Sequence, residues 1–377
     1  MVHVFIVNEK TFKYHLEYMF AGTGAADKLS PFLQNATATF NASTERNLMG
    51  MIADISRIRI GDKIIFYLQA TRNYEGQFFG TFKVTDNPFW DENDDTNYLK
   101  DNMEKGLSYR VKIEPDVVYP KGVTEHQLLD SLDDIDKVSD MCWSLIYRKL
   151  KGNRGCTMIT DKEYLRLLSK LRQQNNNQSL NITHGLTFNS INQLIETTEN
   201  ANQYNGRTNE INVKDRLIYK FNSGRAFETH LQAYILQTID RTPLKEFLLR
   251  ENLPTWIGNE VSCGVGMQRI DILTMQEDED NVYANIIELK CGEAYDDIVN
   301  RQLPWYIKWF NHYIGDTYNK NIVIQPVVLT YETDGVVANQ TLNVNRLRNN
   351  ISVLPVKNIF FTIQNNEVVF RLLEENN

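Results

Sequence analysis

Two strongly apolar segments in the last third of the chain carry charged residues where a buried strand would be expected to stay apolar. Asp271 lies within the run 268–273, and Glu288-Leu289-Lys290 closes the run 283–290. Alternate residues of a strand face the same side, so Glu288 and Lys290 are expected to point one way and Leu289 the other. Charged groups in this setting carry a desolvation cost unless they pair or bind something. Two acids and a lysine suit a hard divalent cation and an attacking water, which predicts metal-dependent phosphodiester chemistry.

A cross-strand salt bridge at a sheet edge is the alternative interpretation of the same residues. Two further features favour a site. An upstream helix carries Glu228, which could add a third carboxylate. Downstream, Gln302 and Tyr306 are four residues apart, which places an amide and a phenol on one face of a helix.

With these elements in this order, residues 216–335 resemble the PD-(D/E)XK nuclease superfamily, in particular its branch of mismatch endonucleases and related restriction enzymes. The resemblance implies that Asp271 and Glu288 are metal ligands and that Lys290 positions or activates water. It also implies that Glu228 supports the metal or its waters and that Gln302 orients the lysine or a phosphate. The chain departs from the family pattern at Ile270, where many members have proline before the aspartate.

The first region is rich in strand-like runs, at 4–7, 58–68, 77–84 and 109–113, followed by helical periodicity at 138–150 and 161–171. Residues 1–172 resemble the PUA-type superfamily, particularly its EVE and YTH-like members. That resemblance implies a small α+β barrel that reads a modified or flipped base. The predicted base-stacking residues are Phe89, Trp90 and Trp143, and a plain core position is the alternative for each ring.

The polar tract 173–213 is rich in Asn and Gln and is predicted to be a linker with one short helix at 189–197. The region 214–377 is predicted to be an α/β nuclease domain with a mixed sheet flanked by helices. Within it, Ser223 is expected to cap a helix over 224–238, and a hairpin is expected to pair 359–363 with 368–372.

Bulk properties agree with a two-domain cytoplasmic protein. The chain has 377 residues, and no apolar run reaches the ~18 residues that a membrane-spanning helix needs. The amino terminus lacks the pattern of a secretory signal, and the four cysteines have neither metal-ligand spacing nor the density of a disulfide framework. The net charge of −8 excludes a uniformly basic surface but permits a local nucleic-acid footprint.

The sequence therefore predicts a Mg²⁺-dependent DNA endonuclease, with Mn²⁺ as an acceptable substitute. Its expected substrate is double-stranded DNA that carries a modified base, and modified cytosine is the first choice. Cutting both strands favours a homodimer, because each nuclease domain offers one site. Two alternatives stay open: a repair endonuclease that recognises mismatched or branched DNA, and an inactive nucleic-acid reader.

Overall fold

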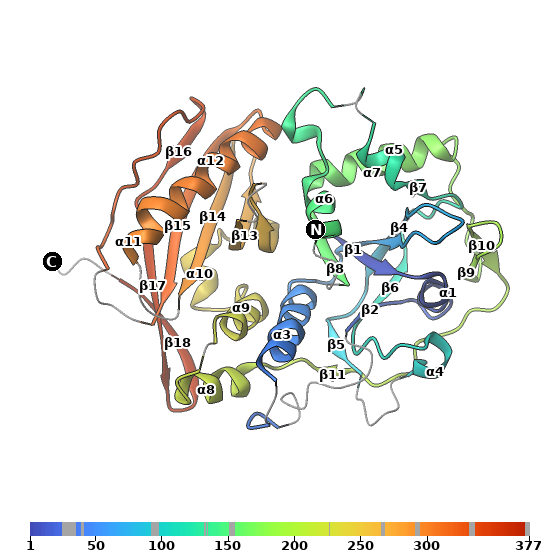
Figure 1. Ribbon diagram of the computed structural model, residues 1–377, viewed down its shortest axis with the longest axis horizontal. Coiled ribbons are helices and arrows are strands. Elements are labelled where there is room, and N and C mark those ends of the chain that lie inside the picture. The colour runs from blue at the N-terminus through green and yellow to red at the C-terminus, as the bar shows by residue number, and fades with distance from the viewer. Residues whose placement is uncertain are drawn as a thin grey trace. The chain divides into compact units, whose positions relative to one another are not determined.

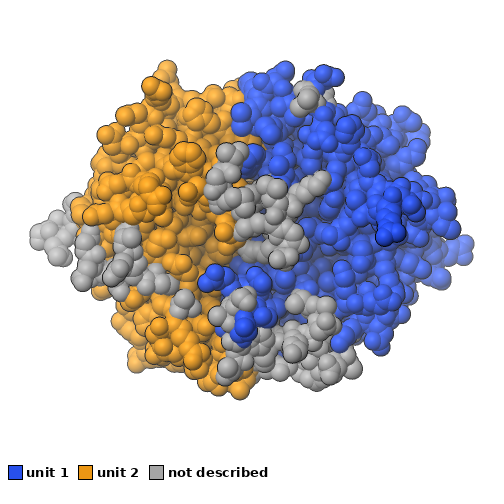
Figure 2. Space-filling view, viewed as in Figure 1, with its two compact units in different colours: residues 1–34, 40–211 blue, residues 35–39, 212–377 orange. Residues whose placement is uncertain are grey.

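The computed structural model describes residues 1–24, 35–38, 41–91, 98–131, 133, 135–150, 155–225, 227–264, 268–290, 295–331 and 336–373. The chain forms two compact units (Figure 2). Unit 1 comprises Met1–Gln34 and Phe40–Ile211, and unit 2 comprises Asn35–Thr39 and Asn212–Asn377.

Unit 1 is a mixed α+β unit built on one sheet that curls on itself (Figure 1). In the described residues its strands are β1 (Val2–Val7), β2 (Phe20–Thr23), β3 (Lys63–Leu68), β4 (Gln77–Val84), β5 (Phe89–Trp90), β6 (Tyr109–Pro115), β7 (Val123–Thr124), β8 (Cys156–Ile159) and β11 (Asn209–Glu210). The order is β11-β5-β6-β4-β3-β1-β8, with β2 paired to β6 and β7 paired to β4. The β1–β3 pair is parallel, and the other pairs are antiparallel.

Helices and helical turns connect these strands: α1 (Glu9–Glu17), α3 (Ala42–Ser56), α4 (Lys100–Met103), α5 (Glu125–Leu129), η2 (Val138–Asp140), α6 (Trp143–Leu150) and α7 (Asp161–Gln174). The Thr160 hydroxyl accepts from the Glu163 amide and the Glu163 carboxylate accepts from the Thr160 amide, so the predicted cap of α7 is confirmed. The single helix expected over 138–150 is instead two elements, η2 and α6.

The segment 173–213 is not a linker, which corrects the prediction from its polar composition. Residues up to Ile211 belong to unit 1. The range expected to be helical lies instead in a hairpin of β9 (Gly185–Asn189) and β10 (Leu194–Thr198). Phe188 packs its ring against Phe12 at 4.9 Å, and Asn175 donates to the carbonyls of Lys121 and Leu171. Leu186, Phe188 and Ile195 of the segment are buried in the core, whereas Ile191 is exposed at the tip of the hairpin.

Unit 2 contains a mixed sheet in the order β12-β13-β14-β15-β17-β18, with β16 paired to β15. Its strands are β12 (Thr255–Ser262), β13 (Arg269–Glu277), β14 (Asn281–Lys290), β15 (Asn321–Thr330), β16 (Ile351–Val353), β17 (Lys357–Gln364) and β18 (Glu367–Leu372). The predicted hairpin of 359–363 with 368–372 is confirmed by the antiparallel β17–β18 pair. The β14–β15 pair is parallel, and its strands are almost completely buried, as strands covered on both faces should be.

The helical elements of unit 2 are α8 (Lys214–Asn222), α9 (Glu228–Thr238), α10 (Leu244–Leu248), α11 (Tyr295–Asp297), the π-helical turn η3 (Ile298–Gln302), α12 (Leu303–Tyr313) and η4 (Gly315–Thr317). Ser223 does not cap a helix at 224, which corrects that prediction. It follows the end of α8, its hydroxyl donates to the Tyr219 carbonyl, and α9 begins at Glu228. Gly224 has a φ of +62°, a conformation that ends a helix more readily than it begins one.

Among the described residues, no helix combines the length and the apolar character that crossing a bilayer requires.

Candidate active site

The antiparallel register of β13 and β14 brings Asp271 and Glu288 to the same end of the unit 2 sheet. Ile272 pairs with Ile287, so Asp271 and Glu288 are the next residues outward and share a face. At this point the Asp271 side chain takes the place of a backbone carbonyl in the hydrogen bonding between the two strands, because its Oδ2 accepts a hydrogen bond of 2.8 Å from the Leu289 amide. That bond fixes the carboxylate and leaves Oδ1 outside it.

Glu288 and Lys290 project from the same face of β14, as alternation predicts. Lys290 Nζ lies 3.0 Å from Glu288 Oε1, and the Glu288 side chain is only 4% exposed against 24% for Lys290. The second carboxylate oxygen, Glu288 Oε2, is buried and has no hydrogen bond of good geometry among the described residues, although the Tyr306 phenol lies close enough to Glu288 to lower its pKa. An uncompensated buried carboxylate oxygen is costly, so this atom marks a position where a ligand would be stabilised.

Helix α9 packs its first two turns toward the same end of β13. Gln232 donates from its amide to the Asp271 carbonyl at 2.9 Å. Glu228 lies four residues earlier, on the same helix face and exposed to solvent. Its charge contributes to raising the pKa of both Asp271 and Glu288, and its predicted role in supporting the metal or its waters stays a prediction.

The helix that begins after β14 contributes Tyr306 and Gln302. Tyr306 is 3% exposed, and burial followed by the Glu288 charge raises the pKa of its phenol. Gln302 ends η3, and its Nε2 donates to Asp297 at 3.4 Å, while its buried Oε1 has no partner among the described residues. The predicted role of Gln302 in orienting Lys290 stays a prediction, because its one defined bond goes to Asp297.

Burial dominates the electrostatics of the three central groups. It raises the pKa of Asp271 well above the usual value, and the Glu288 charge raises it further. Burial also raises the pKa of Glu288, although the Lys290 ammonium acts in the opposite direction. For Lys290, burial lowers the pKa, but the Glu288 carboxylate overcomes this and the net shift is upward. Burial and the repulsion between the two carboxylates thus disfavour their ionised forms, which an added divalent cation would stabilise.

In the part of the chain that the structure describes, no group of three or more His, Cys, Asp or Glu side chains is arranged to hold a metal ion. The pair of Asp271 and Glu288 still fits Mg²⁺, which is commonly bound by one or two carboxylates and keeps several waters. The unpartnered Glu288 Oε2 and the raised pKa values of both acids support that fit.

Two neighbours of the site were not anticipated from the sequence. Cys263, which follows β12, is buried, and burial followed by the Glu288 charge raises the pKa of its thiol, which favours the protonated form at neutral pH. Its carbonyl accepts a 3.0 Å hydrogen bond from Trp305 Nε1. The contact joins a strand end to a helix 42 residues later, and no local pattern signals it.

In unit 1, the three predicted base-stacking rings differ in exposure. Phe89 is 3% and Trp90 is 7% exposed, and the Trp90 indole donates to the Glu210 carbonyl at 3.0 Å. The structure therefore places both rings in the core, because neither offers an open face to a base. Trp143 is half-buried at the start of α6.

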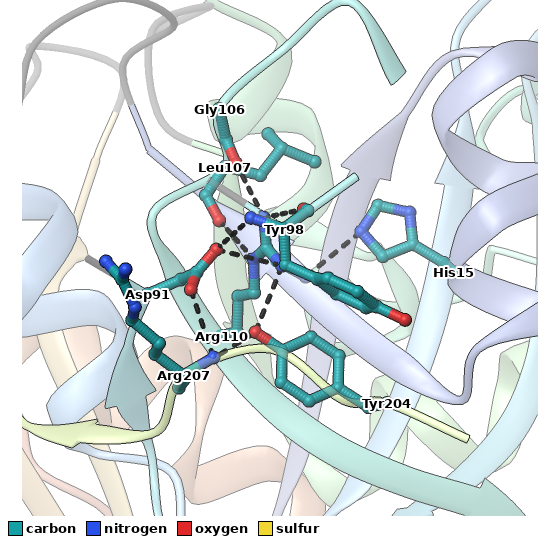
Figure 3. Close-up of polar contacts among 9 residues, drawn as sticks. His15, Asp91, Tyr98, Gly106, Leu107, Arg110, Tyr204 and Arg207 are labelled. Atoms are coloured by element: carbon teal, nitrogen blue, oxygen red, sulfur yellow. Dashed lines mark hydrogen bonds and ion pairs between the residues drawn. The ribbon is translucent and has the colours of Figure 1, made fainter. Parts of the chain in front are cut away.

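Phe89 lies opposite Arg110, which is fully buried at the centre of a polar network (Figure 3). The guanidinium donates to the carbonyls of Leu107, Gly106 and Tyr98 at 2.7–2.8 Å and to the Tyr204 hydroxyl at 3.1 Å. It also pairs with Asp91 at 3.4 Å and lies 4.9 Å from the centre of the Phe20 ring. With its donors committed inside the protein, Arg110 is a structural residue in the described network.

His15 adjoins this network and makes unit 1 sensitive to acid. Its Nδ1 bonds the Thr11 carbonyl at 2.7 Å, so Nδ1 carries the proton, and its Nε2 accepts from the Gly22 amide at 3.1 Å. Burial lowers the pKa of this imidazole to about 3. The folded state therefore holds His15 neutral at pH values where the unfolded chain protonates it, with an ordinary pKa of 6.5.

Unfolding takes up this proton between the two pKa values, so His15 makes unit 1 less stable as the pH falls below 6.5. At pH 5 its contribution is expected to be about 2 kcal/mol less than at pH 7. Urea unfolding of wild type and His15→Gln at both pH values measures this, since glutamine can keep both hydrogen bonds and cannot titrate. Equal loss of stability on acidification in the two proteins would show that His15 is not the cause of the acid sensitivity of unit 1.

No family model matches the chain, and no curated protein matches it. Solved structures resemble part of it. A hypothetical protein from Leishmania major is 12% identical over 46% of this chain and 97% of that chain, with a TM-score of 0.28. The human THYN1 protein in complex with DNA containing 5-methylcytosine is 10% identical over 45% of this chain and 96% of that chain, with a TM-score of 0.27. The DUF55 domain of human thymocyte nuclear protein 1 is 10% identical over 45% of this chain and 98% of that chain, with a TM-score of 0.26. Likeness at these values assigns no family to the chain.

Proposed function

We propose that unit 2 hydrolyses phosphodiester bonds of DNA with the help of Mg²⁺, as an endonuclease. The observation that carries this is the meeting of Asp271, Glu288 and Lys290 at one sheet end, where Glu288 Oε2 is buried and lacks a well-formed hydrogen bond to the described part of the chain. A lone structural ion pair would need one acid for one lysine. Here a second carboxylate, Asp271, lies beside the pair, and burial and the Glu288 charge raise its pKa, so a cation would be needed to keep both acids ionised.

In this proposal Asp271 Oδ1 and Glu288 Oε2 would hold the ion, and Glu228 would hold its waters from the helix above. When bound, Mg²⁺ supplies a Lewis acid for the phosphate and lowers the pKa of a bound water. Lys290 would then turn from Glu288 toward the attacked phosphate, where its positive charge stabilises the negative charge that develops on the phosphate oxygens. Tyr306 keeps its proton because its pKa is raised, so it donates a hydrogen bond and does not act as a base.

Unit 1 is proposed to read a modified base, with modified cytosine as the first choice. The half-buried ring of Trp143 supports this, because a flipped base needs an aromatic face that the core does not wholly cover. The THYN1 structure, which by its title contains 5-methylcytosine DNA, guides only the choice of the first probe.

The most informative test incubates the full-length chain and Mg²⁺ with matched duplexes that carry cytosine, 5-methylcytosine or 5-hydroxymethylcytosine. Cleavage of modified duplexes alone is expected for a modification-dependent restriction enzyme. Equal cleavage of all three would refute the reader and leave an unselective nuclease, and a further preference for mismatched or branched DNA would favour a repair enzyme. Binding without cleavage, in Mg²⁺ and in Mn²⁺, would point to an inactive reader.

Trp143 is the remaining aromatic candidate for base stacking in unit 1. If it stacks on the base, Trp143→Ala should weaken binding of the modified duplex by ~1–3 kcal/mol and leave unmodified binding unchanged. Circular dichroism would check that the variant is folded.

Double-strand cleavage would further require two sites, so analytical ultracentrifugation with and without DNA tests the proposed homodimer.

A further inference from the structure

The solvent side of α12 presents an aromatic and basic stripe that the proposed hydrolysis does not use. Trp305, Lys308 and His312 of α12 and Arg301 of the preceding turn η3 are all exposed, and they recur at intervals of three or four residues. Trp305 is 49% exposed, which is unusual for a ring of its size.

The Trp305 ring is held in place although half of it faces solvent. Its Nε1 donates to the Cys263 carbonyl at 3.0 Å. Gly264 lies against the ring, so closely that a Cβ at Gly264 would come 3.3 Å from it. A ring fixed by a hydrogen bond on one side and by a glycine backbone on another loses little entropy when it binds a flat partner.

The stripe adjoins the candidate active site directly. Tyr306, the next residue, points inward and is buried close to Glu288. Along the exposed side, Arg301 is already committed to Asp297, with two contacts of 2.7 and 2.8 Å. Lys308 forms no ion pair with a described residue, and it lies one helical turn from Trp305, about 5 Å along the axis. An aromatic face and a nearby free cation are the elements with which proteins bind single-stranded nucleic acid.

We propose that this face of α12 binds an unpaired stretch of the DNA strand next to the cut, with a nucleobase on Trp305 and a phosphate at Lys308. The inference deepens the proposed function and rests on it. A base inside a duplex has both faces covered by its neighbours, so only an unstacked base can lie on the indole. The preferred substrate class is therefore DNA that is single-stranded or locally open beside the scissile phosphate.

Binding measured without cleavage tests this directly. In the full-length chain with Asp271→Asn, fluorescence anisotropy would compare a fluorescein-labelled oligo-dT strand with a labelled, blunt-ended and fully paired duplex. Trp305→Leu is expected to weaken binding of the single strand about 5- to 100-fold and to leave duplex binding unchanged. Trp305→Phe should stay close to the parent. Both variants lose the bond to Cys263, and only leucine loses the aromatic face.

Lys308→Ala should reduce the slope of log affinity against log salt by about 0.7 for the single strand, as expected for one lost phosphate contact. Lys245→Ala, which removes an exposed lysine from α10, is the matched control and should leave the slope unchanged.

Equal weakening of single-strand binding by Trp305→Phe and Trp305→Leu, or no weakening by either substitution, would overturn the proposal. Because the readout is binding, a chain that fails to cleave DNA but shows the Trp305 pattern would refute the proposed hydrolysis and not this surface.

Discussion

Asp271→Asn is expected to abolish DNA cleavage, lowering the rate by about 10³-fold or more, while DNA binding persists. Asparagine keeps the volume of the side chain, and its oxygen can still accept the bond from the Leu289 amide. The negative charge that would hold the cation is lost, and metal-ion catalysis is worth several kcal/mol of transition-state stabilisation. Cleavage of a labelled duplex under single-turnover conditions measures the loss.

Glu279→Gln is the matched control for this substitution. Glu279 lies in the turn that joins β13 to β14, at the opposite end of these strands, and is exposed. Its neutralisation should leave the cleavage rate unchanged. Purified Asp271→Asn that cuts at nearly the wild-type rate, with Glu279→Gln behaving likewise, would move the chemistry to another part of the molecule.

Arg110→Met is expected to cause the largest loss of stability of any single substitution in unit 1, about 3–5 kcal/mol. The change leaves Asp91, only 1% exposed, without its guanidinium partner and removes the donors to three carbonyls, of which that of Gly106 is buried and those of Leu107 and Tyr98 are partly buried. A loss of this size is a large part of the ~5–15 kcal/mol that stabilises a typical domain. Urea unfolding followed by circular dichroism would show it as a lower transition midpoint.

Lys83→Met is the control for Arg110→Met within the same sheet. Lys83 and its partner Glu114 are each about half exposed and 3.6 Å apart, so their pair contributes little in water. The urea-unfolding midpoint of Lys83→Met should stay at the wild-type value. A midpoint for Arg110→Met that matches the control would mean that the buried network is not important for the stability of unit 1.

Local patterns predicted those elements whose determinants lie close together in the chain. The Thr160–Glu163 capping box starts α7 where expected, and the β17–β18 hairpin follows from two alternating runs around a polar turn. The spacing of Asp271 and Glu288 was informative for the same reason. Their strands form a hairpin, so a tight turn sets the register that places both acids at one end.

Sequence patterns failed where distant segments decide burial. Arg110 sits at a polar position of an alternating strand and would be expected at the surface. The rings of Phe20 and Tyr204, which lie about 90 residues before and after Arg110 in the chain, cover its guanidinium. This face of the strand is therefore buried instead of exposed. Phe188 similarly turns a polar segment into part of unit 1 because its ring completes the cluster around Phe12. The sequence of each segment alone does not indicate which distant residues will pack against it.

The metal dependence of cleavage by the wild-type chain tests the central claim most directly. Supercoiled DNA and a modified duplex would be incubated with purified protein in Mg²⁺, in Mn²⁺ and in excess EDTA, with Asp271→Asn purified in parallel to detect contaminating nucleases. The account predicts strand cleavage in either metal, none in EDTA, recovery when Mg²⁺ is restored, and none with the variant. Cleavage that persists in EDTA, or equal cleavage by wild type and Asp271→Asn, would contradict it.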